Sequence, residues 1–153
     1  EVEATPNGPL VMNGGVIEGC TNGIITSTNG SGVSAQIVLN GVYFESNSTS
    51  HIDLGTDGSS YWGRAICIGC FFNGGTIKLG SKSKIIFIGI QGNGGSPVTV
   101  SGSANAEAYF YGCEMGSFTQ SGTFLWSTGQ PVSYTPTITN VTTSAKTASY
   151  IVS

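Results

Sequence analysis

Residues 65–73 read AICIGCFFN, an apolar run that a single glycine, Gly69, divides into two short pieces. Four other segments repeat the pattern of an apolar run, a glycine and a small residue: VIEGCTN (16–22), IVLNGVYFE (37–45), IIFIGIQGN (85–93) and AYFYGCEMG (108–116). Their glycines are Gly19, Gly41, Gly69, Gly89 and Gly112. A varying period of about 22 residues, longest between Gly41 and Gly69, predicts a β-solenoid in which each repeat forms one rung, that is, one turn of the chain.

Alignment of the five segments on this glycine produces two apolar columns. Two residues before it stand Ile17, Leu39, Cys67, Phe87 and Phe110, and one residue after it stand Cys20, Val42, Cys70, Ile90 and Cys113. Equivalent positions stack in a parallel β-helix, so both columns predict interior ladders. The glycine is expected to let the backbone bend where a Cβ would obstruct it, which shifts the side-chain alternation by one residue.

The pair Cys67 and Cys70 forms a CxxC, which is also a metal or redox motif. Each cysteine occupies a column position that another segment gives to a plain hydrophobe, which favours reduced thiols buried in the core. A structural zinc needs four ligands and the second pair is missing, while DLGTDG (53–58) lacks the late glutamate of a calcium loop. Neither a metal nor another cofactor is therefore expected.

The columns that should face outward are also largely apolar. They contain Val16, Val38, Ile66, Ile86 and Tyr109, then Glu18, Asn40, Ile68, Ile88 and Tyr111, and then Thr21, Tyr43, Phe71, Gln91 and Glu114. Strands that are apolar on both faces are normally buried on both faces, and an apolar strip on a solenoid indicates an interface. Side-by-side packing in a homotrimer is the favoured explanation, and cover by the chain's own tail or by missing sequence is the alternative.

Composition limits the partners and the number of domains. The 153 residues fit one domain, only 8% of them are charged, the net charge is −3, and the five basic residues form no long run. Nucleic acid is therefore an unsuitable partner, and no apolar stretch is long enough for a transmembrane segment. The start, EVEATPNGPL, has no initiator Met and no signal-peptide pattern, so the chain is expected to be a piece of something longer.

We predict two regions, solenoid coils in residues 1–126 and a C-terminal cap or trimerisation tail in 127–153. The tail is rich in Ser and Thr, alternates β-forming residues and is interrupted by Pro131 and Pro136, as suits edge or extended segments. A solenoid end needs such a cap to prevent edge pairing.

The segments LNGVYF (39–44) and CIGCFF (67–72) resemble right-handed parallel β-helices of the pectate-lyase-like superfamily. The low charge, the NGG repeats (13–15, 73–75 and 93–95), the apolar outer columns and the Thr-rich tail are most similar to bacteriophage tailspikes and related tail or neck appendages. The resemblance covers about residues 10–126. It implies a right-handed helix of about five coils in a homotrimer, placed on the virion and extracellular on host contact, that binds a host surface polysaccharide and often cleaves it.

A long loop is expected within residues 46–65, because the spacing from Gly41 to Gly69 exceeds the typical one by about six residues. It carries His51 and Arg64 together with the aromatic pair Tyr61 and Trp62, which we predict to bind a glycan. The alternative is a loop whose Asp and Gly residues only make turns, with Trp62 folded onto the solenoid.

Glycosidases generally use two carboxylates, and Glu45, Asp53 and Asp57 are the candidates for a catalytic pair. The sequence leaves three functions open. The first is a noncatalytic, glycan-binding section of a trimeric viral fibre, the second a glycan-cleaving hydrolase or lyase, and the third a non-viral adhesin or ice-binding module. We favour them in this order. Acidic groups are scarce, which disfavours cleavage, and regular Thr-x-Thr repeats, which ice binding would require, are missing.

Overall fold

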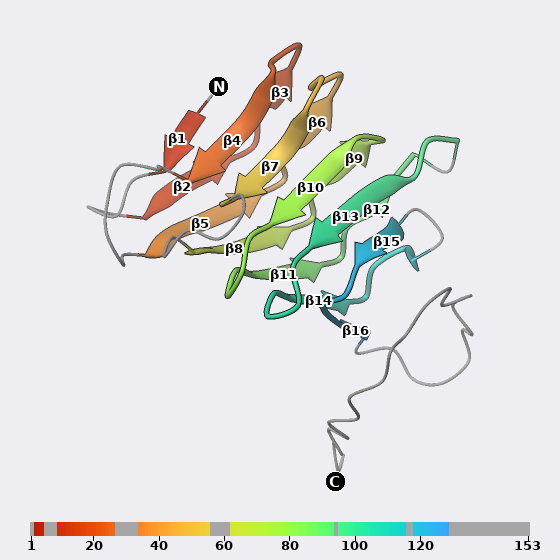
Figure 1. Cartoon of the computed structure of the whole chain (residues 1–153). Helices are drawn as coiled ribbons and strands as arrows, with labels where there is room; N and C mark the ends of the chain where they lie inside the picture. Colours follow the sequence, from red (N-terminus) through yellow and green to blue (C-terminus); the bar gives the residue numbers. More distant parts are fainter. Residues whose placement is uncertain are drawn as a thin grey trace, which may run out of the picture.

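The computed structural model describes residues 2–4, 9–26, 34–55, 62–93, 95–115 and 118–128. The strands within these ranges form three parallel sheets, here called A, B and C (Figure 1). This confirms the prediction of an all-β chain with parallel strands, and the arrangement is consistent with a parallel β-solenoid.

Each sheet gathers strands from all along the chain. Sheet A contains β1 (Val2–Ala4), β4 (Asn22–Thr26), β7 (Ser50–Leu54), β10 (Thr76–Leu79), β13 (Val98–Gly102) and β15 (Phe118–Gly122). Sheet B contains β2 (Leu10–Asn13), β5 (Ser34–Asn40), β8 (Trp62–Ile68), β11 (Lys84–Ile88), β14 (Glu107–Tyr111) and β16 (Leu125–Thr128). Sheet C contains β3 (Val16–Glu18), β6 (Tyr43–Glu45), β9 (Phe71–Asn73) and β12 (Gln91–Gly92).

The described strands visit sheets B, C and A in that order in each rung. Rung 1 is β2–β4, rung 2 is β5–β7, rung 3 is β8–β10 and rung 4 is β11–β13. Every strand pairs in parallel with strands of its own sheet in the neighbouring rungs, and Figure 1 shows sheets A and B as two layers that run the length of the stack. A position in one rung therefore has an equivalent neighbour in the next.

Apolar side chains fill the space between the sheets. In sheet B they alternate with outward residues, as in β11, where Ile85 and Phe87 are fully buried. Phenylalanines dominate the interior: the Phe44 and Phe72 rings stack 4.9 Å apart, and the Phe72 ring meets the edge of Phe87 at 6.2 Å. Burial of such rings supplies most of the stabilisation available to a chain with few charges.

The repeated glycines end the strands of sheet B with a left-handed backbone conformation. Gly41, Gly69, Gly89 and Gly112 have φ angles between 54° and 64°. Leu39, two residues before Gly41, and Val42, the residue after it, are both buried. The predicted shift in alternation is therefore confirmed. Its predicted cause is wrong, because a Cβ at these four positions would meet no atom within 4 Å. Glycine is needed there for its positive φ and not for space.

The predicted alignment of residues 16–22 with the other four segments is wrong. Ile17 lies in sheet C opposite Phe44, whereas the residue that pairs with Leu39 in sheet B is Met12. Gly14 takes the place assigned to Gly19, and its N–H donates to Asn40 just as the Gly41 N–H donates to Ile68. The first spacing therefore runs from Gly14 to Gly41 and is longer than the one predicted from Gly19.

The corrected alignment also removes Cys20 from the cysteine column, because Cys20 follows β3 at the junction of sheets C and A. Cys67 and Cys70 occupy the core as predicted, with exposed fractions of 0% and 1%. All four cysteines are thiols.

The strands of sheet B continue through β16 to Thr128, so the described β structure passes the predicted boundary at residue 126. Of the predicted tail, residues 127–153, the part from 129 to 153 lies outside the described residues. Among those that are described, there is no helix that could cross a membrane.

Candidate functional site

Two polar and aromatic ladders form the outer face of sheet C. The first runs through Val16, Tyr43, Phe71 and Gln91, which are in register on four successive rungs. The rings of Tyr43 and Phe71 stack with their centroids 5.2 Å apart and their planes 10° from parallel. Both side chains are half-buried, so the pair presents an accessible aromatic surface.

Beside the rings runs a ladder of carboxylates and amides. Glu18, Glu45 and Asn73 are in register on β3, β6 and β9, and Asn93 follows on the next rung. The Asn73 Nδ2 donates to Glu45 Oε1 at 2.9 Å, and the Asn93 Nδ2 donates to Asn73 Oδ1 at 2.8 Å. These bonds fix the planes of the groups, leaving lone pairs and N–H groups directed outward for further hydrogen bonding.

The two ladders are electrostatically connected. A side-chain hydrogen bond with Glu45 is the largest cause that raises the pKa of the Tyr43 phenol above its ordinary value of 10.0. The phenol therefore stays protonated at neutral pH and can donate. Aromatic faces next to planar polar groups are what the apolar and hydroxyl sides of a sugar ring require.

The predicted catalytic residues are not brought together by sheet register. Glu45 lies on β6 in sheet C, and Asp53 lies on β7 in sheet A opposite Lys78. The Asp53 carboxylate also accepts the Gly55 N–H at 3.1 Å. Asp57 lies outside the described residues. The carboxylates that do share a ladder are Glu45 and Glu18, a pairing the sequence alignment missed because it placed Glu18 in the wrong column.

The predicted glycan-binding residues are also separated. Arg64 is exposed on the outer face of sheet B, and His51 is buried with both ring nitrogens in hydrogen bonds to protein groups. Tyr61 and the side chain of Trp62 lie outside what the structure describes, although the Trp62 backbone begins β8. His51 is therefore held inside the protein and is not exposed on the outer face of sheet C.

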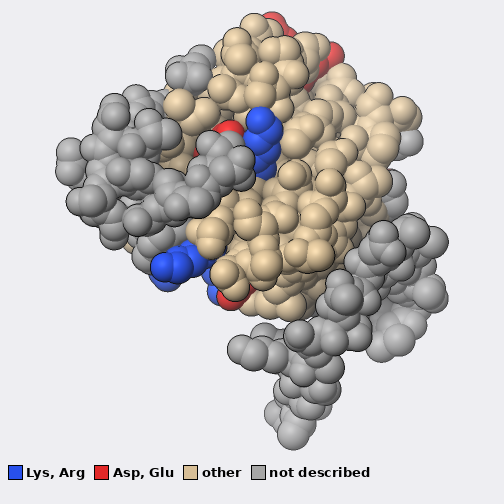
Figure 2. All heavy atoms as spheres, viewed as in Figure 1, with Lys and Arg blue, Asp and Glu red and all other residues tan. Residues whose placement is uncertain are grey.

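The outer face of sheet B carries six of the seven most exposed large apolar side chains in the described chain, namely Val11, Ile66, Ile68, Ile88, Tyr111 and Leu125. Ile66 is in register with Ile86, and Ile68 with Ile88, so the side chains form continuous columns across rungs 3 and 4. On the side that Figure 2 turns to the viewer, where the strands of sheet A lie nearest in Figure 1, charged atoms are also sparse. The predicted apolar outer columns are confirmed for sheet B.

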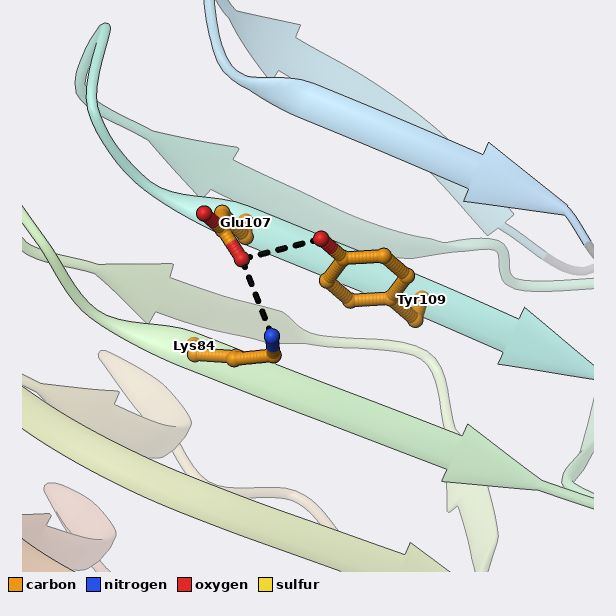
Figure 3. Close-up of polar contacts among 3 residues, drawn as sticks. All are labelled: Lys84, Glu107 and Tyr109. Atoms are coloured by element: carbon orange, nitrogen blue, oxygen red, sulfur yellow. Dashed lines mark hydrogen bonds and ion pairs between the residues drawn. The ribbon is translucent and has the colours of Figure 1, made fainter. Parts of the chain in front are cut away.

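One charged cluster borders this apolar face (Figure 3). Glu107 on β14 forms an ion pair with Lys84 on β11, with an N–O distance of 3.1 Å, and accepts a 2.9 Å hydrogen bond from the Tyr109 hydroxyl. The Lys84 ammonium also lies 4.5 Å from the centre of the Tyr109 ring. The two charged side chains are about 40% exposed, so the cluster orients groups at the surface more than it stabilises the fold.

The interior thiols form a second electrostatic pair. A side-chain hydrogen bond between Cys67 and Cys70 lowers the pKa of Cys70 to about 7 and raises the pKa of Cys67 well above its ordinary value. Across the described residues, no group of three or more His, Cys, Asp or Glu side chains could hold a metal ion. Both thiols are buried among apolar side chains, so the pair is part of the core packing.

Comparisons with protein-family models, with curated proteins and with solved structures found no match. The outer faces of sheets B and C are therefore the features of the molecule that indicate a function.

Proposed function

We propose that this chain is a section of a trimeric, tailspike-type viral appendage that binds a host cell-surface glycan. In this proposal the sheets form a right-handed parallel β-helix of about five coils with a cap in residues 127–153, and the protein is carried on the virion as a tail or neck appendage. The apolar outer face of sheet B is the observation that carries it, because an apolar strip of this size on a charge-poor solenoid is suited to burial against other copies.

The oligomeric state tests this proposal directly. We expect light scattering to give three times the monomer mass, independent of concentration over a wide range. Ile66→Asn, which places a polar group in the middle of the face, is expected to produce monomers. Val16→Asn is the matched control, since Val16 is exposed but lies on sheet C. A monomeric wild-type chain would contradict the trimer, and a stable dimer would indicate two sheet B faces packed against each other.

Glycan binding is assigned to the outer face of sheet C. The stacked Tyr43 and Phe71 rings would contact the C–H side of a sugar, while Glu45, Asn73 and Asn93 would bind its hydroxyls. The spacing of neighbouring rungs, about 4.8 Å, suits the successive hydroxyls and rings of a linear polysaccharide better than an isolated small molecule.

The binding test uses a panel of soluble bacterial polysaccharides and titration calorimetry. Phe71→Ala is expected to weaken binding of the recognised polysaccharide at least tenfold, which corresponds to about 1.4 kcal/mol. Thr99→Ala, on the outer face of sheet A, is the matched control and should bind normally. Equal affinities for the two variants would show that the binding site does not include the aromatic ladder of sheet C.

Glycan cleavage is a second candidate, favoured by the register of Glu18 with Glu45. Retaining glycosidases hold their two carboxyl groups about 5 to 5.5 Å apart, close to the spacing of adjacent strands. If the pair is catalytic, Glu18→Gln and Glu45→Gln should each abolish release of reducing ends while binding remains. If the wild-type chain binds the polysaccharide but does not cleave it, the noncatalytic, glycan-binding function is supported instead.

A further inference from the structure

A buried hydrogen-bond network joins three rungs at the junction of sheets C and A. His51 is 1% exposed, its Nε2 lies 2.6 Å from the Gly74 carbonyl oxygen, and its Nδ1 lies 2.9 Å from Asn47 Nδ2. The same Asn47 Nδ2 donates to the Ile17 carbonyl at 3.0 Å, and Asn47 Oδ1 accepts the Cys20 N–H at 3.1 Å. Ile17 and Cys20 belong to rung 1, Asn47 and His51 to rung 2, and Gly74 to rung 3.

The backbone partners determine the protonation state of the ring. The Cys20 N–H can only donate, so it must face Asn47 Oδ1, and the Ile17 carbonyl can only accept, so it must face Nδ2. The second Nδ2 proton then points at His51 Nδ1, which must accept. The proton of a neutral imidazole is therefore on Nε2, where it is donated to the Gly74 carbonyl.

The ring has little freedom to avoid these partners. It lies beside the stacked Phe44 and Phe72 rings, with centroid distances of 5.7 and 5.9 Å. At its Nε2 edge, a Cβ added to Gly75 would be 2.2 Å from His51 Nε2, so the backbone of rung 3 packs directly on the imidazole. A change at the ring must therefore be accommodated by movement of the rungs.

We propose that the Asn47–His51 network is an acid-sensitive link between three rungs, which holds them together only while the imidazole is neutral. A second proton on Nδ1 would face the Asn47 Nδ2 donor. Rotating the Asn47 amide would restore an acceptor to the ring, but it would present Nδ2 to the Cys20 N–H and leave the Ile17 carbonyl without its donor. Either arrangement breaks buried hydrogen bonds, and an unpaired buried polar group is strongly unfavourable.

No charged group among the described partners offsets this effect. The hydrogen-bond partners of the ring, the Asn47 amide and the backbone of rung 3, are neutral. Burial is the largest cause that lowers the pKa of His51 below 6.5, and backbone hydrogen bonds with Gly74 and Asn73 raise it by less. Apart from the thiol of Cys20, the titratable side chains on the surrounding elements lie on the outer faces of their strands; they are Glu18, Tyr43, Glu45, Asp53 and Lys78.

The sign of the pH effect follows from the lowered pKa. The unfolded chain binds a proton near pH 6.5, whereas the folded chain resists it to a lower pH. The contribution of neutral His51 to stability is therefore fully present above pH 6.5 and is lost as the pH falls from 6.5 toward the folded-state pKa. Over this window the unfolding equilibrium constant should rise by up to tenfold per pH unit.

The sequence contains a single histidine, which makes the measurement unambiguous. The first experiment titrates the imidazole of the wild-type chain by NMR between about pH 7.5 and pH 5, where carboxylates with ordinary pKa values near 4 remain largely ionised. We expect the neutral ring to carry its proton on Nε2 and to titrate below 6.5, while amide exchange at Cys20 accelerates beyond its intrinsic pH dependence. A ring that titrates at or above 6.5, or that carries the proton on Nδ1, would overturn the proposal.

Asn47→Asp is the matched variant, because it changes one amide to a carboxylate of the same size. The carboxylate can still accept the Cys20 N–H, and it accepts from a protonated Nδ1 as well. We expect the pKa of His51 to rise above 6.5, so that stability against denaturant is lost as the pH rises from 6.5 through the raised pKa, the opposite of the wild-type trend, whatever the overall loss of stability. An unchanged sign would show that the link does not sense the charge of His51. If the variant does not fold, the wild-type titration alone decides the outcome.

Discussion

The ring of Phe87 stacks on that of Phe110 in the next strand of sheet B, with centroids 4.8 Å apart and planes inclined by 22°. Phe87 also meets Phe72 of sheet C and Phe118 of sheet A, so one side chain joins all three sheets in the interior. These contacts join rung 3, rung 4 and the following turn, which contains β14 and β15.

Replacement of Phe87 should therefore be among the most destabilising changes in the core. We expect Phe87→Ala to lower the free energy of unfolding by about 3 to 5 kcal/mol, because it removes the transfer free energy of the ring and leaves a cavity. Phe87→Leu retains most of the volume and should have a smaller effect. Denaturant titration measures both, and equal effects would show that the site collapses around the smaller side chain.

Gly69 offers a test of the backbone explanation for the repeated glycines. Its φ is 54° and a Cβ there would meet no atom within 4 Å. Gly69→Ala should therefore lower the free energy of unfolding by about 1 to 2 kcal/mol through conformation alone. Gly69→Asn should be milder, because asparagine tolerates this region better. A larger loss for Asn than for Ala would point to a steric restriction instead.

The pKa of the Tyr43 phenol should depend on the carboxylate of Glu45 beside it. Because the hydrogen bond with Glu45 raises the pKa of Tyr43, Glu45→Gln is expected to bring that pKa back toward 10.0. Ultraviolet titration of phenolate formation, taken as the difference from Tyr43→Phe, isolates this group from the other tyrosines. A pKa that is unchanged by Glu45→Gln would mean that the two ladders of sheet C act independently.

We expect one thiol of the core pair, that of Cys70, to ionise at a pH near 7. Cys70 should ionise with a pKa of about 7 because Cys67 donates to it, and its thiolate contributes stability above pH 9.0 that is lost as the pH falls through about 7. Cys67→Ala removes the donor and should raise the pKa of Cys70. Thiolate absorbance in the folded protein measures this change, with Cys113→Ala as the control for a thiol outside the pair.

The sequence was sufficient to predict parallel β structure, because an apolar run ending in a glycine recurs at a varying but similar spacing. Leu39, Cys67, Phe87 and Phe110 stack in sheet B as that pattern predicts. The first rung was misplaced because glycines with positive φ occur at two junctions of that rung, after β2 and after β3. A glycine alone does not distinguish the two, whereas the pairing of Met12 with Leu39 does.

The candidate site was harder to predict, since it depends on register between rungs and not on a local motif. Tyr43 and Phe71 were recognised as outward residues, but their stacking and their position beside Glu45 and Asn73 follow from the pairing of strands that belong to different rungs. The polar residues of 46–65 were predicted to share a loop, whereas His51 and Asp53 lie on β7. Of these, His51 turned out to bind its own neighbouring rungs, which a lone histidine in a sequence does not reveal.

The parallel register also bears on how the chain reaches this structure. Ile66 pairs with Val38 in the preceding rung and with Ile86 in the following one, so consecutive pairings close loops of similar and moderate length. The entropy of loop closure grows only with the logarithm of that length, which makes the addition of each new turn about equally difficult. Folding should then begin at the aromatic centre formed by Phe72, Phe87 and Phe110 and spread toward both ends, without any pairing between distant parts of the chain.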